Sequence, residues 1–186
     1  AGDYDGDAKA DLVVYRPSTG TWYVLPTLSG SPYQLQFGLN GDTPVVGDYD
    51  GDGKYDIAVW RGATGVWYRV NSSDGSVASY QFGVSGDIPT QADFDGDGRT
   101  DIAVFRPSTG QWYIVRSLTG SISITQWGIS EDQPVVGDYD GDGLDDIAVF
   151  RPSNGTWYRI SSFNGTNVFT QFGSTGDLPI PRYDAP

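Results

Sequence analysis

Residues 48–56 read DYDGDGKYD: Asp48, Asp50 and Asp52 alternate with other residues, and Asp56 directly precedes the apolar run IAVW. Carboxylates this close together repel one another at neutral pH, and the repulsion opposes a compact turn unless a cation lies among them. The stretch therefore predicts a metal-binding loop that leads straight into a β-strand.

The residue types in this loop indicate which metal it would take. Carboxylate oxygens and a backbone carbonyl from Lys54 suit a hard cation such as calcium. The chain contains no histidine and no cysteine, which excludes sites for softer metals. The loop also differs from an EF-hand, because Val59 stands at the twelfth position, where an EF-hand has a bidentate glutamate.

The acidic loop occurs four times at one interval. The other copies begin at Asp3 (DYDGDAKAD), Asp93 (DFDGDGRTD) and Asp138 (DYDGDGLDD), so that 48 − 3, 93 − 48 and 138 − 93 all equal 45. A single acidic, glycine-rich turn can be merely a solvated loop, but four copies in register favour a metal site. The predicted ligands, with the carbonyl donors of the seventh position included, are Asp3, Asp5, Asp7, Lys9, Asp11, Asp48, Asp50, Asp52, Lys54, Asp56, Asp93, Asp95, Asp97, Arg99, Asp101, Asp138, Asp140, Asp142, Leu144 and Asp146.

The remainder of each repeat predicts β-strands. Runs such as DIAVF and QWYIV are rich in β-branched and aromatic residues, and turns of Gly, Pro, Ser and Asp separate them. Four strands per 45 residues favour a β-propeller over a two-stranded solenoid. We therefore expect an all-β propeller of four four-stranded blades in one domain, 1–186, with repeats 1–46, 47–91, 92–136 and 137–181 and a closing strand to 186.

The two ends of the chain contain complementary parts of one repeat. A segment such as GDTPVV precedes each acidic loop except the first, and the C-terminal GDLPIPRYDAP supplies such a segment with no acidic loop after it. Because open sheet edges invite pairing, the C-terminal segment is expected beside the N-terminal repeat. Pairing within one molecule, which we favour here, closes a ring; pairing with a neighbouring chain gives a head-to-tail oligomer.

The combination GDYDGDGxxDIAVFRPSTGxWY…QFG…GDxPVxGDYDGDG resembles the FG-GAP/VCBS repeat family, whose calcium-loop blades also build the integrin α-chain propeller. The resemblance covers essentially the whole chain and implies one calcium ion per blade, about four in all. Two features depart from the family pattern. The family's propellers commonly have seven blades, whereas this chain has four units. In addition, Ala8 stands where the other loops have Gly53, Gly98 and Gly143. If that position requires a positive φ, the first loop should be the weakest site.

The composition agrees with an extracellular, calcium-binding protein. The 186 residues carry a formal charge of −13, which four calcium ions would reduce to −13 + 8 = −5. No basic surface for nucleic acid and no transmembrane run is visible, so we expect neither nucleic-acid binding nor membrane insertion. Without cysteine there are no disulfides, and calcium is expected to stabilise a secreted or cell-surface domain.

A second motif combines an arginine with a Trp-Tyr pair in every repeat. Tryptophan and arginine can bind a sugar between blades, but tryptophan can equally pack in the core while arginine stacks on it or caps a turn; we favour packing for most copies. The aromatic residues of the QFG element, Phe37, Phe82, Trp127 and Phe172, are expected in the core. The candidate ligand-binding residues are Arg16, Trp22, Arg61, Trp67, Arg106, Trp112, Arg151 and Trp157.

The repeated acids argue against catalysis. A glycosidase needs an acid and a base in different environments, whereas these carboxylates recur alike four times. A Ser/His/Asp or Cys/His arrangement is impossible without histidine or cysteine. We expect a non-catalytic extracellular calcium-binding module in structural assembly, adhesion or protein interaction, with a protein, a glycan or a second copy as partner. The alternative is a lectin-like carbohydrate-binding module.

Overall fold

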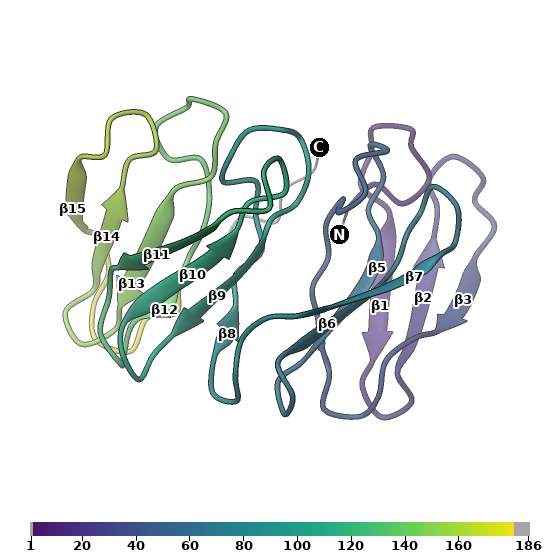
Figure 1. Ribbon diagram of the computed structural model, residues 1–186, viewed down its shortest axis with the longest axis horizontal. Coiled ribbons are helices and arrows are strands. Elements are labelled where there is room, and N and C mark those ends of the chain that lie inside the picture. Colours follow the sequence, from purple (N-terminus) through teal and green to yellow (C-terminus); the bar gives the residue numbers. More distant parts are fainter. Residues whose placement is uncertain (1, 181–186) are drawn as a thin grey trace. The chain divides into compact units, whose positions relative to one another are not determined.

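A computed structural model describes residues 2–180, and the regular secondary structure in that range consists of β-strands alone (Figure 1). A five-residue strand, here called the long strand, follows each acidic loop, and these strands begin 45 residues apart, at Leu12, Ile57, Ile102 and Ile147. The strands are β1 (Leu12–Arg16), β2 (Thr21–Leu25), β3 (Tyr33–Gln36), β4 (Thr43–Pro44), β5 (Ile57–Arg61), β6 (Val66–Val70), β7 (Val77–Gln81), β8 (Ile88–Pro89), β9 (Ile102–Arg106), β10 (Gln111–Val115), β11 (Ile122–Gln126), β12 (Gln133–Pro134), β13 (Ile147–Arg151), β14 (Thr156–Ile160) and β15 (Asn167–Gln171).

The strands form four separate antiparallel sheets in which sequence neighbours pair. Three sheets have four strands, in the orders β4-β5-β6-β7, β8-β9-β10-β11 and β12-β13-β14-β15. The first has three in the described residues, in the order β1-β2-β3. This all-β, blade-like architecture confirms the fold predicted from the 45-residue repeat.

The second strand of a full sheet is buried on both faces. In β5, Ile57, Ala58, Val59 and Trp60 are all buried, and Val59 lies opposite Tyr68 of β6. β-branched and aromatic side chains suit this position because they fill the space on either face of a pleated sheet. The near-continuous apolar run IAVW therefore follows from packing on both sides of the strand.

Glycine ends the turn between the second and third strands of a sheet. In the second repeat Gly65 has φ 67°, and a Cβ there would lie 2.2 Å from the carbonyl oxygen of Gly83. The Gly65 carbonyl also accepts the Phe82 N–H at 2.8 Å, which fixes the outermost strand against the turn. A side chain at this position would break the contact, so only glycine fits.

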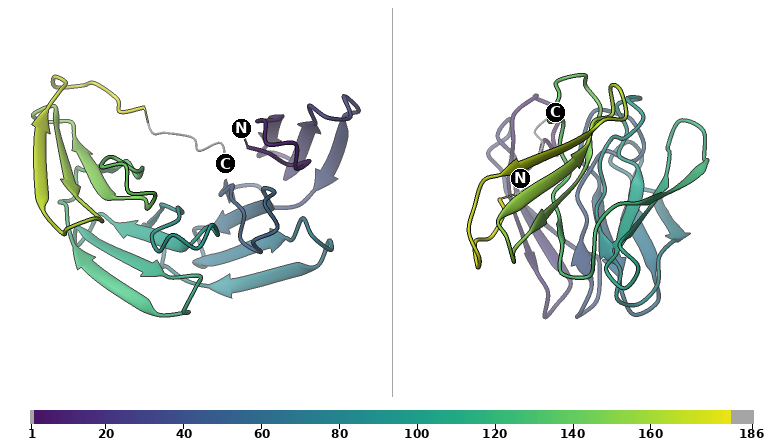
Figure 2. Two further views of the ribbon diagram at one scale, coloured as in Figure 1. Left: turned by 90° about the horizontal axis from the view of Figure 1, so that it is seen from above. Right: turned by 90° about the vertical axis from the view of Figure 1, so that its left-hand side faces the viewer.

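The chain consists of two compact units, each with two sheets that lie beside each other (Figure 2). The first contains residues 2–85 and 98–100, and the second contains 86–97 and 101–180. The core of the first unit is Tyr4, Trp22, Val24, Ile57 and Val59. The second unit has two core clusters, formed by Ala92, Phe94, Ala103, Phe105, Trp112, Ile114 and Val149 and by Val135, Ala148 and Phe150.

One core prediction is wrong. Phe172 was expected to be buried with its counterparts, but its side chain is 78% exposed. Phe37 and Trp127 do pack against the core clusters of their units. Phe172 directly follows β15 of the last sheet, and within residues 2–180 no further sheet follows to cover it.

Residues 181–186, which include most of the predicted closing strand, lie outside the described residues. In residues 2–180 there is no helix that could cross a membrane.

Candidate metal centre

Each acidic loop is closed by a β-bridge and folded around its first aspartate. In the second loop the Asp56 N–H donates to the Gly47 carbonyl at 2.8 Å, which joins the two ends. The Asp48 carboxylate then accepts the Gly51 N–H at Oδ1 (2.6 Å) and the Gly53 N–H at Oδ2 (2.8 Å). The first aspartate therefore holds the loop closed through both of its oxygens.

The last aspartate connects the loop to the turn after the third strand of the sheet. Asp56 Oδ2 accepts the Tyr49 N–H at 2.9 Å, and Oδ1 accepts the Ser72 N–H at 2.7 Å. Asp56 and its counterpart Asp101 are fully buried, and burial raises the pKa of both carboxyls. A nearby cation stabilises the negative charge of a buried carboxylate.

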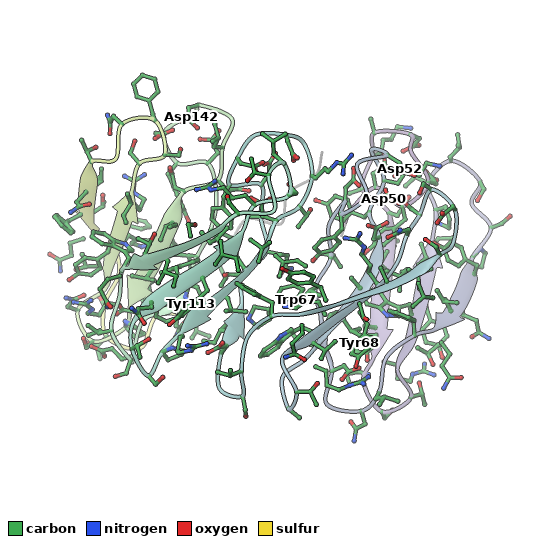
Figure 3. The ribbon with its side chains drawn as sticks, viewed as in Figure 1. Asp50, Asp52, Trp67, Tyr68, Tyr113 and Asp142 are labelled. Carbon is green, nitrogen blue, oxygen red and sulfur yellow. The ribbon has the colours of Figure 1, made fainter. Side chains whose placement is uncertain are left out.

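Three carboxylates meet in each loop. The first, second and last aspartates bring one oxygen each to within 4.8 Å of one another, and Figure 3 labels members of these loops at one end of the sheets. Asp95 belongs to one of these groups, and its Oδ1 is buried with no hydrogen-bond partner in the described residues. An oxygen left in this state fits a cation ligand. The four groups are Asp3, Asp5 and Asp11; Asp48, Asp50 and Asp56; Asp93, Asp95 and Asp101; and Asp138, Asp140 and Asp146.

The third aspartate of each loop lies outside this group of three. Asp52 Oδ1 accepts the Lys54 N–H at 2.9 Å and the Ser72 hydroxyl at 2.8 Å. In the first loop, Asp7 has the same two kinds of contact, with the Lys9 N–H and the Thr27 hydroxyl. It also forms an ion pair with Lys9 at 2.9 Å, and the hydrogen bond from Lys9 lowers the pKa of Asp7. Metal binding by Asp7, Asp52, Asp97 and Asp142, and by the four carbonyls of the seventh position, stays a prediction.

A serine or threonine outside each loop donates hydrogen bonds to two of the loop's aspartates, and sequence reasoning missed this residue. Ser72 donates its N–H to Asp56 and its hydroxyl to Asp52, so one residue fixes two carboxylates. The available signal was a serine or threonine 16 residues after the last aspartate of every loop. The four residues are Thr27, Ser72, Ser117 and Ser162.

Ala8 has the backbone conformation that the sequence predicted for its position. Its φ is 62°, and it is the one non-glycine residue with a positive φ among the described residues. Gly53, Gly98 and Gly143 have φ values of 84°, 82° and 92° at the same position. The Ala8 N–H still donates to Asp3 Oδ2 at 2.7 Å, so the first loop closes in the same way at the cost of backbone strain.

Three of the four candidate ligand-binding arginines form ion pairs at the opposite end of the long strands, and the fourth, Arg16, donates to the Tyr23 hydroxyl. Arg61 donates from Nε and Nη2 to the two oxygens of Asp42, both at 2.9 Å, and its guanidinium lies 4.5 Å from the centre of the Tyr68 ring. Asp42 is the aspartate of the Gly-Asp-x-Pro segment, a partner that sequence reasoning missed. Its signal was an aspartate 19 residues before the arginine. The other pairs are Arg106 with Asp87 and Arg151 with Asp132, stacked on Tyr113 and Tyr158.

Three of the four candidate tryptophans are buried. Trp22, Trp67 and Trp112 have exposed fractions of 1%, 4% and 0%, whereas Trp157 is partly exposed. Each of the four donates its indole N–H to the backbone carbonyl of the aromatic residue 15 positions later; for Trp112 this acceptor is Trp127, at 2.8 Å. The arginines stack on the neighbouring tyrosines rather than on the tryptophans.

Models of known protein families match the chain along its repeats. A model described as FG-GAP-like repeat matches residues 3–59, 48–104 and 93–149, and one described as FG-GAP repeat matches 132–167. The chain therefore belongs to the FG-GAP-like repeat family, as its motifs predicted. A search of curated proteins gave no significant match.

Solved structures share the fold at low sequence identity. A streptogramin B lyase structure is 11% identical with a TM-score of 0.62, and the match covers 92% of this chain and 53% of that one. A catalytically inactive virginiamycin B lyase from Staphylococcus aureus with quinupristin is 12% identical with a TM-score of 0.58, covering 88% and 52%. The chain thus spans about half the length of these two proteins.

Proposed function

We propose that the chain is an extracellular, calcium-stabilised repeat module whose role is structural assembly or protein interaction. The observation that carries the proposal is the group of three carboxylates in every acidic loop, with oxygens within 4.8 Å of one another. Without a cation, such groups repel one another and destabilise the folded loop. Calcium accepts six to eight oxygen ligands, so carbonyls, water and the third aspartate would complete the shell.

The chemistry of the donor set supports calcium over other metals. All side-chain donors are carboxylates, and the chain has no histidine or cysteine. The buried oxygen of Asp95 without a hydrogen-bond partner is the clearest single atom that a cation would satisfy. Millimolar calcium is typical outside cells, and loops of this kind fit the affinity class of extracellular modules, roughly 0.1–1 mM or tighter. This supports a secreted or cell-surface location.

A non-catalytic role is favoured because the four centres repeat the same arrangement. Catalytic carboxylates work as pairs whose environments differ, whereas here the same backbone donors serve the same aspartates in successive loops. The lyase activities belong to the similar structures, and similarity at 11–12% identity concerns the fold alone. The family membership supports an interaction module.

Carbohydrate binding, the alternative function, has less support. A sugar-binding tryptophan must present a ring face, but Trp22, Trp67 and Trp112 are buried and donate their indole N–H groups to backbone carbonyls. Arg61 is occupied by Asp42 and Tyr68. We therefore propose a protein partner rather than a glycan.

Calorimetric titration of the chain with calcium tests the proposal. We expect about four ions per chain, and Asp50→Asn should remove one of them because it neutralises one carboxylate of the second group. Asp74→Asn is the matched control, since Asp74 is exposed and lies in no acidic loop. Absence of binding at millimolar calcium, or an unchanged stoichiometry in Asp50→Asn, would contradict calcium binding at these loops.

A further inference from the structure

Acidic loops that follow one another in the sequence are joined through the backbone. The N–H of the residue just before the last aspartate of a loop donates to the carbonyl of the first aspartate one repeat earlier. The pairs are Tyr55 with Asp3 at 2.6 Å, Thr100 with Asp48 at 2.6 Å and Asp145 with Asp93 at 2.8 Å. Each pair lies within one compact unit, since residues 98–100 belong to the first. Each bond therefore places residues of one loop directly beside a candidate metal ligand of the loop before it.

The side chain at the seventh position of a loop lies over a glycine of the loop before it. This glycine stands between the second and third aspartates of its own loop. The contacts join Lys54 to Gly6, Arg99 to Gly51 and Leu144 to Gly96, where a Cβ on the glycine would lie 2.8, 2.5 and 3.4 Å from the facing side chain. The seventh residue of one loop therefore brings its side chain to the acidic residues of the preceding loop.

These contacts give the loops different charged neighbours. A cationic side chain lies against the first and the second loop, whereas the uncharged Leu144 lies against the third. The third loop also has an additional acidic neighbour, because Asp145 stands where the neighbours of the other two are Tyr55 and Thr100. Asp145 Oδ2 accepts the Asp93 N–H at 3.0 Å, so this carboxylate lies against the first aspartate of the third loop. Compared with the second loop, the third thus has one more negative neighbour and one fewer positive neighbour.

A hydrogen-bond difference within the loops also distinguishes the third. In the second loop, Asp50 Oδ1 accepts the Asp52 N–H at 3.2 Å. The corresponding oxygen of the third loop, Asp95 Oδ1, is buried and accepts no hydrogen bond in residues 2–180. A buried carboxylate oxygen without a donor is the state that a bound cation stabilises most. This observation is independent of the charges on the neighbouring loops, and it also favours cation binding at the third loop.

We propose that the seventh and eighth residues of each loop set the calcium affinity of the loop one repeat earlier, so that the third loop binds calcium more tightly than the first and second. A positive neighbour opposes the binding of a divalent cation, and a negative neighbour favours it. Lys54 and Arg99 therefore weaken the first and second loops, and Asp145 strengthens the third. The inference rests on the proposed calcium binding, and it assigns the order in which the loops fill.

The second and third loops provide the comparison that isolates the effect of neighbours. Both have four aspartates at the same positions and glycine at the sixth position. These glycines, Gly53 and Gly98, have φ values of 84° and 82°. The strain at Ala8 affects only the first loop, so it does not enter this comparison. The two loops differ instead in the residues that the following loop places against them.

A calcium titration followed by the amide signals of individual residues in NMR tests the proposal. The fourth-position glycine of every loop donates its N–H to Oδ1 of the first aspartate at 2.6 Å, so its signal reports on one loop. At low ionic strength the Gly96 signal should reach the midpoint of its change at about tenfold lower calcium than the Gly51 signal. Equal midpoints, or an earlier change at Gly51, would overturn the proposal.

Asp145→Asn tests the negative neighbour, because it removes the charge and keeps an oxygen that can accept the Asp93 N–H. The midpoint of Gly96 should rise about three- to tenfold, and that of Gly51 should not change. Glu131→Gln is the matched control, since it removes one negative charge from the same unit near the opposite end of the long strand. No shift at Gly96 in Asp145→Asn, or an equal shift in the control, would contradict the role of Asp145.

An exchange at the seventh position tests the positive neighbour and leaves the contacts of Asp145 in place. Arg99→Leu should lower the midpoint of Gly51 about three- to tenfold, and Leu144→Arg should raise that of Gly96 by a similar factor. Unchanged midpoints in both variants would overturn the role of the seventh residue. Amide signals that do not respond to millimolar calcium at all would refute calcium binding itself. Calcium-dependent shifts without the predicted order would refute only the present inference.

Discussion

The guanidinium of Arg61 and the carboxylate of Asp42 form two parallel hydrogen bonds of 2.9 Å, with the Asp42 side chain 2% exposed and that of Arg61 25% exposed. This pair joins β5 to the turn before the short strand β4. It therefore fixes the place where each Gly-Asp-x-Pro segment meets the long strand that follows it.

Asp42→Asn is expected to lower the free energy of unfolding by about 3 kcal/mol, because it leaves a partly buried guanidinium without its counter-charge. The matched control is Asp177→Asn, which has no arginine partner among residues 2–180 and should cost close to nothing at low protein concentration. Urea unfolding at dilute protein measures both. Equal effects of the two substitutions would contradict the stabilising role of the pair.

Ala8→Gly should stabilise the chain by about 0.5–1 kcal/mol, because Ala8 has a φ of 62° that glycine adopts without strain. Gly53→Ala should have the opposite sign and a similar size, since its φ is 84° and a Cβ there meets no other atom within 4 Å. Chemical denaturation in saturating calcium provides both values. Calorimetry should also show tighter binding at the first loop in Ala8→Gly, and destabilisation by that change would refute the assignment of strain.

Ser72→Ala should cost about 1 kcal/mol, because Asp52 loses the hydroxyl that donates to it at 2.8 Å while the backbone N–H to Asp56 remains. Ser72→Thr is the matched control, since Thr27 fills this position in the first loop with a hydroxyl that contacts Asp7. Thermal unfolding compares the two variants. If threonine were as damaging as alanine, the hydroxyl would not be the group that matters.

Trp112→Ala should lower the free energy of unfolding by about 3–5 kcal/mol, because the side chain is fully buried between Phe105 and the rest of its cluster. Trp157→Ala should cost clearly less, since Trp157 is only partly buried in the described chain. Denaturant unfolding of both variants checks the difference. Equal losses would mean that the faces of the last and third sheets are covered to the same extent.

Much of the fold could be predicted because each 45-residue unit repeats its local signals. The aspartate and glycine spacing predicted the loop, and the β-branched runs predicted the strands. The glycine that the other loops have at the position of Ala8 predicted a positive φ there, which the structure has. Local backbone preference determines each of these features, so they can be inferred from a short stretch of sequence.

The contacts that could not be predicted depend on which strands meet. Pairing of Arg61 with Asp42 follows from the register of β4 on β5 across 19 residues. The contact of Ser72 with Asp56 likewise depends on where the turn after β6 meets the loop, although a serine or threonine recurs at this spacing. The exposure of Phe172 also could not be predicted from its local sequence. Phe172 has the same neighbours in sequence as Phe37, yet it is exposed because burial depends on a facing sheet rather than on the residue itself.

Anomalous diffraction from crystals grown in millimolar calcium, recorded at a long wavelength, tests the central claim most directly. We predict one calcium peak in each acidic loop, with oxygens of the first, second and last aspartates within about 2.3–2.6 Å of the ion. The first loop should show the lowest occupancy as calcium is reduced, because of the strain at Ala8. Well-ordered loops with water and hydrogen bonds but no anomalous peak at saturating calcium would contradict calcium binding by these repeats.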